Sequence, residues 1–357
     1  MSERKFVIVD GSSLLSTCYY AVLPREIMFA KTDEEKQKHY DKILHAADGT
    51  YTNGIFGVLK AVVSLLKKQQ PDHMAFVFDK TRDTLRRELY QDYKGTRSAT
   101  PEPLKQQFVL LEQILEDAGF RVLYSSQYEA DDYAGSLVMK FRDRIPMVVM
   151  TKDHDYLQLV DDGHNVRAWM VQSKQEKADE LYDKYYAPYG MDKRSVNLPE
   201  KTFEFTAGHV LAEEGVWPHQ ITDLKGIQGD TSDNILGVKG VASAAPILLG
   251  EYGTIEEIYA AIHEAEKDKA SLKELQDFWK SGLGISRSPY KALTKTGEED
   301  ELCGEAAALL SKQLATIKTD IAIEETLDDF HVSGYDEDKL KAWCRKLDIK
   351  EESVFGK

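Results

Sequence analysis

Three short apolar runs in the chain each lead into an aspartate. They are residues 6–9 followed by Asp10, residues 74–78 followed by Asp79, and residues 147–150 followed, after two residues, by Asp153. Runs of this length and composition are typical of strands buried on both faces of a parallel sheet. Because ligands bind at the carboxyl ends of such strands, we expect the three carboxylates to lie at one rim of an open α/β sheet.

Six further acidic residues are expected at the same rim. They occur in three short segments: Glu129, Asp131 and Asp132; Asp155; and Asp230 and Asp233. Each segment alone has an ordinary structural explanation, as the first turn of a helix, a polar turn after a strand, or a helix cap. Nine carboxylates that converge at one rim have no such explanation, because they repel each other unless cations lie between them. The sequence therefore predicts bound multivalent cations.

The chemistry of these ligands narrows the choice of metal. Carboxylate oxygens select Mg²⁺ or Mn²⁺ over zinc, and such ions usually act on phosphate oxygens. Two of them about 4 Å apart would clamp a phosphodiester, one activating water and the other stabilising the leaving oxygen. This chemistry is that of a hydrolytic nuclease.

A basic and aromatic run follows the second predicted strand. In Leu89-Tyr-Gln-Asp-Tyr-Lys-Gly-Thr-Arg97, Tyr90 and Tyr93 offer faces for base stacking, and Lys94 and Arg97 offer phosphate contacts. Either cation could also offset charge that develops on the scissile phosphate. A solvated basic face is the ordinary alternative for this run alone.

A glycine-containing turn, Gly237-Val-Lys-Gly-Val241, lies between two predicted helical segments. Such a hairpin would aim backbone N–H groups at a phosphate, and Gly237, Lys239 and Gly240 are the candidate contacts. Many turns carry two glycines, so the motif is weak when taken alone.

The order of predicted elements favours a mostly parallel, doubly wound α/β sheet. We expect a nuclease core over residues 1–205, with a helical arch around 82–115 and insertions near 25–49 and 165–199. Residues 206–357 are expected to form a helical duplex-binding region with the hairpin at 237–241 and a C-terminal tail. A strand at 121–124 and a helix at 129–142 complete the expected core.

Composition limits the classes of protein. The net charge of −15 at first argues against a nucleic-acid partner, but between residues 80 and 105 seven Lys or Arg outnumber four Asp or Glu, and local sign matters more than the total. Three widely spaced cysteines make a disulfide framework or a thiolate zinc site implausible. No apolar segment reaches the length of a membrane helix, and no signal sequence is evident, so we expect a cytoplasmic protein without a membrane partner.

As a set, the motifs resemble the bacterial 5′-3′ exonuclease and flap endonuclease family, which includes the 5′-nuclease domain of bacterial DNA polymerase I. The matching stretches occur in family order over about residues 5 to 262: 7–11, 76–79, 93–97, 128–132, 151–155 with 158–160, and 226–235 with 237–240. The resemblance implies a PIN-like nuclease core with a helix-hairpin-helix-type motif. No polymerase segment follows, so a stand-alone member is expected.

The resemblance also implies an activity and a ligand set. A family member would be a metal-dependent phosphodiesterase that removes 5′ flaps or RNA primers at junctions of single and double strands in DNA replication and repair. Its partners would be DNA with a 5′ flap, nick or overhang and RNA–DNA hybrids, and we expect a monomer. One ion would be held mainly by Asp10, Asp79, Glu129, Asp131 and Asp132, and the second by Asp153, Asp155, Asp230 and Asp233. Mn²⁺ is the expected substitute for Mg²⁺.

The resemblance assigns further roles to the basic run and the hairpin. Lys94 and Arg97 would accompany the scissile phosphate on or beside an arch through which the 5′ strand passes, and Asp131 and Asp153 would be essential for cleavage. The hairpin would grip the duplex backbone, in family members often with a bound K⁺. Here Val241 leads into Ala242-Ser-Ala-Ala-Pro246, where family hairpins commonly carry a further glycine and a Lys-Thr-Ala run. This departure removes a cation and one donor.

Two other functions stay open at this point. A PIN-type RNA endonuclease would share the acidic cleft, but a duplex-gripping hairpin would be superfluous for single-stranded RNA. A nucleic-acid-binding module without catalysis would be better served by fewer negative charges.

Overall fold

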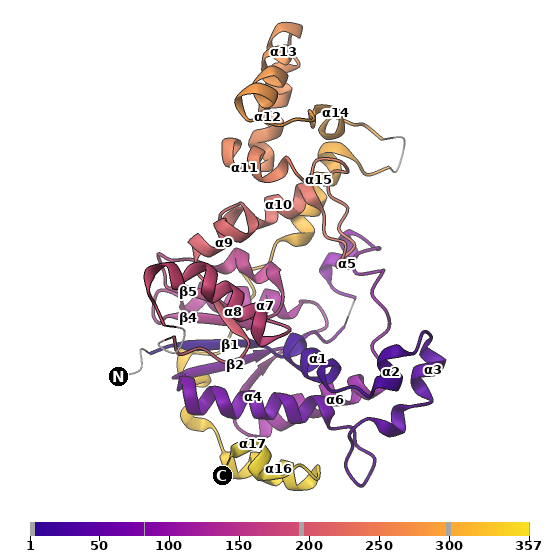
Figure 1. The fold of residues 1–357 in the computed structure, drawn as a ribbon, viewed down its shortest axis with the longest axis vertical. Helices are drawn as coiled ribbons and strands as arrows, with labels where there is room; N and C mark the ends of the chain where they lie inside the picture. The colour runs from indigo at the N-terminus through magenta and orange to yellow at the C-terminus, as the bar shows by residue number, and fades with distance from the viewer. Residues whose placement is uncertain (1–3, 82, 193–195, 298–300, 357) are drawn as a thin grey trace.

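A six-stranded sheet forms the centre of the molecule (Figure 1). The computed structural model describes residues 4–81, 83–192, 196–297 and 301–356. The strands lie in the order β3-β2-β1-β4-β5-β6, and all pair in parallel except β6, which is antiparallel to β5. Their bounds are β1 Phe6–Asp10, β2 His73–Val77, β3 Arg121–Leu123, β4 Met147–Thr151, β5 Val166–Val171 and β6 Thr202–Phe205. The predicted mostly parallel α/β sheet is confirmed.

Both faces of the sheet are covered by helices. Successive side chains of a strand point to opposite faces, so in β1 Val7 and Val9 pack on one side and Phe6 and Ile8 on the other. The first side contacts α1 (Gly11–Ala21), α4 (Asn53–Gln69) and α6 (Glu102–Asp117), and the second contacts α7 (Ala130–Phe141). Burial on both sides explains why these strands are continuous apolar runs.

A helical region extends beyond one edge of the sheet (Figure 1). It contains α9 Ala207–Glu214, α10 Ile221–Gln228, α11 Ala245–Tyr252, α12 Ile255–Ala265, α13 Lys269–Asp277, α14 Tyr290–Leu293 and α15 Gly304–Ala315. Its apolar side chains join those of β5 and β6 in one cluster, which includes Phe203, Val210 and Leu224. No helix in the described ranges is long and apolar enough to span a membrane.

The last forty residues do not belong to the helical region, which corrects the predicted boundary of 206–357. After α15 the chain returns to the sheet, where Phe330 packs against Phe6 and Phe141. Helices α16 (Glu337–Lys346) and α17 (Glu351–Phe355) then lie beneath α4, at the opposite end from α13 (Figure 1). The apolar stripe of α16 shows that it needs a partner, but its spacing does not say which surface provides one.

The insertion predicted near 165–199 is wrong over most of its length. Residues Val166–Val171 form β5, which is fully integrated in the sheet, and α8 (Gln175–Tyr185) packs its Ala178 and Tyr182 inward. Arg167 and the surrounding lysines and aspartates hid this strand, because β5 lies next to the sheet edge and is less uniformly apolar than β1 or β4. Residues 193–195 of the predicted insertion lie outside the described residues.

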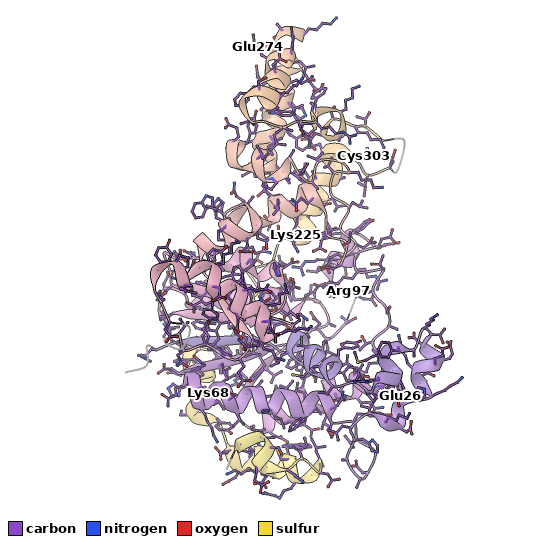
Figure 2. All side chains as sticks on the ribbon, in the orientation of Figure 1. Glu26, Lys68, Arg97, Lys225, Glu274 and Cys303 are labelled. Atoms are coloured by element: carbon purple, nitrogen blue, oxygen red, sulfur yellow. The ribbon has the colours of Figure 1, made fainter. Side chains whose placement is uncertain are left out.

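The segment predicted to be an excursion, residues 25–49, is anchored at two points. It contains α2 (Arg25–Phe29) and α3 (Asp33–Gln37), whose side chains are mostly exposed, and Glu26 marks its position away from the sheet (Figure 2). Ile27 and Ile43 are buried and join the core under α4.

The arch predicted around 82–115 is shorter than expected. Arg82, where it would begin, lies outside the described residues. Helix α5 (Leu85–Leu89) is followed by non-helical residues 90–101, and α6 starts after Pro101. Leu111 and Ile114 of α6 are fully buried, so one side of this helix belongs to the core, while another side, with Lys105, Phe108 and Glu112, lines the cleft described below.

Candidate active site

Three aspartates meet at the carboxyl ends of β1, β2 and β4, as the sequence predicts. Asp10 ends β1 and is buried, with its Oδ1 accepting from Ser13 N at 2.8 Å and its Oδ2 from Thr151 Oγ1 at 2.7 Å. Asp79 follows β2 and accepts from Ala130 N at 2.9 Å, the first amide of α7. Asp153 follows β4 and accepts from the amide of Asp155.

The first turn of α7 carries the second group of acids. Glu129 precedes the helix, and Asp132 closes a capping box by accepting from Glu129 N at 3.1 Å. The oxygens of Asp132 are further engaged by Arg86 and by Lys318 N, and the side chain is buried. This carboxylate does not line the cleft formed by the other acids, so the capping explanation accounts for it.

The third group lies on a loop held by a close approach between two glycine backbones. Gly229 and Gly237 have φ values of +74° and +60°, and a Cβ on Gly237 would lie 2.2 Å from Gly229 N. Asp230 and Ile235 exchange backbone hydrogen bonds of 2.9 and 2.8 Å above this contact. The loop between them presents Asp230 and Asp233 toward β4.

Eight of the nine predicted acids line one cleft with a volume of about 1120 Å³. The cleft also contains Glu112, and six basic side chains share it, which leaves an excess of three negative charges. The eight acids come from strand ends, a helix start and the loop: Asp10, Asp79, Glu129, Asp131, Asp153, Asp155, Asp230 and Asp233.

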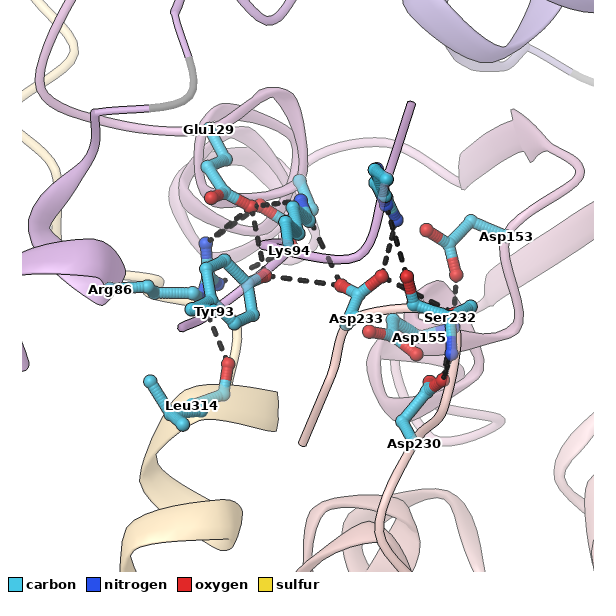
Figure 3. A network of polar contacts seen from close by, with 12 residues as sticks. Arg86, Tyr93, Lys94, Glu129, Asp153, Asp155, Asp230, Ser232, Asp233 and Leu314 are labelled. Atoms are coloured by element: carbon cyan, nitrogen blue, oxygen red, sulfur yellow. Dashed lines mark hydrogen bonds and ion pairs between the residues drawn. The ribbon is translucent and has the colours of Figure 1, made fainter. Parts of the chain in front are cut away.

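Several carboxylates of this cluster form ion pairs with basic side chains (Figure 3). Lys94 Nζ lies 2.6 Å from Glu129 Oε2 and 3.8 Å from Asp233 Oδ2. Arg97 pairs with Asp233, and Lys225 pairs with Asp155 and, at 2.7 Å, with Asp230.

Arg86 is the fourth cation of the site, and it is almost fully buried. Its guanidinium lies 3.1 Å from Glu129, 3.3 Å from Asp131 and 2.7 Å from Asp132. The sequence predicts metal ions as the charges that compensate these carboxylates. In the protein as described, protein cations supply a large part of that compensation.

The carboxylates of the cleft fall into two classes, those with a lowered pKa and those with a raised pKa. Burial opposes ionisation of Glu129 and Asp230, but Lys94 and Arg86 lower the pKa of Glu129 to about 2, and Lys225 lowers the pKa of Asp230 to about 2. Burial and the charge of Asp79 raise the pKa of Asp10 to about 7. Burial also raises the pKa of Asp131 and of Asp153, although Arg86 and Lys225 respectively oppose it.

The donor set fits a divalent cation by its chemistry. The cleft offers nine Asp and Glu carboxylates beside several hydroxyl groups and one imidazole, it holds an excess of negative charge, and Asp10 and Asp79 repel each other. Across the described ranges, no three His, Cys, Asp or Glu side chains are gathered closely enough to hold a metal as they stand. Ion pairs with Lys94, Arg97 and Lys225 hold several of these carboxylates apart.

The predicted nucleic-acid contacts divide into exposed and buried residues. Tyr93 is 3% exposed, and its hydroxyl lies 3.2 Å from Glu129 and 3.1 Å from Asp233, so its ring cannot stack on a base. Tyr90 is half-buried against Tyr93, Ile235 and Leu314. Base stacking by Tyr93 is therefore corrected, because the run folds back onto the acids at this position, while Tyr90 and the exposed Arg97 remain predicted contacts.

Part of the hairpin is buried as well. Gly237 is buried and donates its N–H to Ser311 Oγ at 2.9 Å, and Val238 donates to Ile227 O at 2.7 Å. The prediction that Gly237 contacts a phosphate is therefore wrong in this conformation. Lys239 and Gly240 are exposed at the tip and stay available to a ligand.

Sequence reasoning missed Arg86 and Lys225 as members of the site. Arg86 was counted only in the local charge of residues 80–105, and Lys225, on α10, precedes Asp230 by five residues. The signal that could have identified them is the need of buried carboxylates for cations on nearby segments. Thr84, which donates to Glu129 Oε1 at 2.9 Å, gave no such signal.

Comparison with known proteins matches two segments of the chain to family models. Residues 5–186 match the 5′-3′ exonuclease N-terminal resolvase-like domain, and residues 216–283 match the 5′-3′ exonuclease C-terminal SAM fold. DNA polymerase I of Caldicellulosiruptor bescii is 30% identical over 349 residues, and that of Streptococcus pneumoniae R6 is 29% identical over 353 residues. These alignments cover 97% and 98% of this chain but 33% and 32% of the polymerases, so the chain spans about a third of their length.

Solved structures share the fold at low identity. The zinc-bound 5′-exonuclease of bacteriophage T5 superposes with a TM-score of 0.54 at 18% identity, covering 96% of this chain and 98% of that one. The catalytic core of Rad2 in complex with a DNA substrate gives 0.51 at 14%, covering 96% and 88%. The resolvase-like model covers half of the sequence and spans the strand ends that carry the acids. The chain belongs to the 5′-3′ exonuclease family.

Proposed function

We propose that the protein is a metal-dependent, structure-selective 5′ nuclease that cleaves phosphodiester bonds of DNA at junctions between single and double strands. The observation that carries this proposal is the cleft in which eight carboxylates and the side chains of Lys94, Arg97 and Lys225 come together beside the hairpin region. Family membership supports it, as does the fold shared with nucleases whose structures were solved with divalent metal ions and with DNA substrates.

Divalent ions would be held by the cleft carboxylates, with Asp10, Asp79, Glu129 and Asp131 on one side and Asp153, Asp155, Asp230 and Asp233 on the other. When bound, two such ions supply Lewis-acid activation of water and of the phosphodiester. We propose Mg²⁺ as the physiological metal, with Mn²⁺ as its substitute. Asp132 is left out of the ligand set because its oxygens serve the capping box and Arg86.

Lys94 and Arg97 are the groups placed to meet the scissile phosphate. Both line the cleft and both are now paired with acids, so binding of a phosphate requires them to exchange Glu129 and Asp233 for phosphate oxygens. Each would offset negative charge on the phosphate as it develops. The number of ion pairs would stay the same, because a bound metal ion would take the place of Lys94 and Arg97 beside Glu129 and Asp233.

The hairpin favours a duplex over single-stranded RNA as the second contact. Lys239 and Gly240 are exposed at its tip, and the closely packed glycines beneath them fix it relative to Asp230 and Asp233. We propose that it contacts the backbone of the duplex behind the junction, with K⁺ as an additional ligand there. A flap, nick or overhang is then the expected substrate for a monomeric protein in the cytoplasm, and an RNA primer is an alternative 5′ strand.

The test uses 5′- and 3′-labelled flap, nicked and single-stranded substrates with Mg²⁺, Mn²⁺ or chelator. Cleavage of the flap near the junction in the presence of metal, and none with chelator, is expected. The Asp131→Asn and Asp153→Asn double variant should bind flap DNA without cutting it. A double variant that still cuts would overturn the proposal, and preferential cleavage of single-stranded RNA would favour the PIN-type alternative.

A further inference from the structure

Arg86 joins the acidic cleft to a segment that neither family model covers. Its Nε donates to Leu314 O at 3.0 Å, and its Nη2 donates to Thr316 O at 3.1 Å. The matched segments end at residues 186 and 283, before this part of the chain. The side chain is 7% exposed, so these bonds are shielded from water (Figure 3).

The opposite edge of the same guanidinium faces the acids. Nη1 contacts Glu129, Asp131 and Asp132, and Nη2 contacts both Asp131 and Asp132. The planar fork of arginine can hold two carboxylates and two carbonyls at fixed angles, which a lysine ammonium cannot do. The position of Asp131, which lines the cleft, is therefore set by a group anchored on the end of α15.

Residues 311–318, which we call the connector, are linked to the hairpin and to two of the acidic segments. Ser311 Oγ accepts from the hairpin amide of Gly237 at 2.9 Å, and Lys318 N donates to Asp132 Oδ1 at 2.8 Å. Gln158 donates to Ala315 O at 3.1 Å and to Asp155 O at 2.8 Å. One short segment thus contacts the hairpin and Asp132 directly and the backbone of Asp155 through Gln158.

We propose that Arg86 is a positioning residue of the nuclease site: clamped by the connector, it fixes Glu129 and Asp131 and tunes the charge that a divalent cation meets in the cleft. This inference rests on the proposed nuclease function. Arg86 need not touch the substrate, because its effect passes through the two carboxylates. Through Arg86 the connector also becomes part of the active site. It thereby holds the hairpin and the acidic residues in fixed relative positions.

Two variants test the proposal by removing different properties of the side chain. Arg86→Lys keeps the charge and loses the fork, and Arg86→Gln keeps polarity and loses the charge. The matched control is Arg87→Gln, because Arg87 neighbours Arg86 but is partly exposed and pairs with Asp83 at 3.1 Å. Mn²⁺ binding to the full chain without DNA is measured by electron paramagnetic resonance, beside kcat and KM on a 5′-flap substrate.

For Arg86→Lys we expect a kcat lower by about 10²-fold, from misplaced reacting groups, with KM and Mn²⁺ affinity close to those of the parent. For Arg86→Gln we expect Mn²⁺ to bind about 3- to 10-fold more tightly, because a competing cation is gone, while kcat again falls. A merely structural role would weaken Mn²⁺ binding and thermal stability together in both variants, and that result would overturn the proposal.

Other outcomes are also decisive. A folded Arg86→Lys protein with parental kcat would refute the positioning role, as would an Arg87→Gln control that behaves like Arg86→Gln. If the parent protein cuts none of the DNA substrates, the proposed function fails by itself. The Mn²⁺ titration then still decides whether Arg86 controls the charge of the cleft.

Discussion

Lys94 Nζ lies 2.6 Å from Glu129 Oε2, so a residue expected at the phosphate is bound by one expected at the metal. The neighbouring pair of Arg97 and Asp233 repeats this arrangement. The ion pairs of the cleft thus occupy groups that its ligands would bind. A metal ion would bind the carboxylates and a phosphate would bind the Lys and Arg side chains, and together they would break these ion pairs.

Replacement of Lys94 should separate metal binding from cleavage. In Lys94→Gln, Glu129 loses its ammonium partner and becomes more available to a cation, while a positive charge near the phosphate is lost. We expect cleavage of a 5′ flap to fall by about 10²- to 10³-fold in single-turnover assays, with Mn²⁺ affinity not weakened. Lys105→Gln, in an exposed residue at the rim of the same cleft, is the control, and equal losses in both variants would contradict this assignment.

Removal of the Tyr93 hydroxyl should lower stability without any effect on base stacking. Tyr93→Phe leaves Glu129 and Asp233 each without one hydrogen bond in a buried place, which costs about 1–3 kcal/mol. Urea denaturation at pH 7 measures this loss in the free energy of unfolding. Tyr90→Phe should change it much less, because Tyr90 is half-buried against the same cluster.

Replacement of Lys225 should make stability depend on divalent metal. In Lys225→Gln, Asp155 and Asp230 lose their shared cation, and an uncompensated buried charge costs about 3 kcal/mol. Added Mg²⁺ should raise the melting temperature of the variant more than that of the parent, because the ion replaces the ammonium. Lys152→Gln, in an exposed lysine of the same cleft, serves as the control. Equal responses to Mg²⁺ in all three proteins would contradict the replacement.

A pH dependence is expected from His73, far from the cleft. Burial and the neighbouring His331 lower the pKa of His73 below 6.5. The unfolded chain therefore binds a proton more readily, and the stability that neutral His73 contributes above pH 6.5 is lost as the pH falls below that value. We expect His73→Gln to show a smaller loss of unfolding free energy than the parent between pH 7.5 and 5.5, measured by urea denaturation at each pH. His219→Asn, at an exposed position, should keep the parental slope.

The parts of the fold that sequence analysis predicts well are those with one strong signal. Strands β1, β2 and β4 are uniformly apolar because both faces are covered, and each aspartate that follows sits where the topology requires. β5 escaped prediction because Arg167 breaks its pattern. The docking of Trp343 against α6, where its Nε1 donates to Asp117 Oδ2, could not be predicted, since an amphipathic stripe does not identify its partner surface.

In the site, too, the residues that could be predicted are those with a strong sequence signal. The carboxylates were recognisable because several sit beside strand ends or glycines, whereas Arg86 was not, since its partners Leu314 and Thr316 lie more than 220 residues away in sequence. Tyr93 and Gly237 were assigned to solvent because their residue types suit nucleic acid, although packing had committed both to the interior.

The return of the chain from α15 to the sheet has a mechanical consequence. The helical region is joined to the rest of the chain at two places, near residues 206 and 316, and its apolar core is continuous with that of β5 and β6. A displacement of this region relative to the sheet would therefore have to bend both connections and also separate packed apolar side chains.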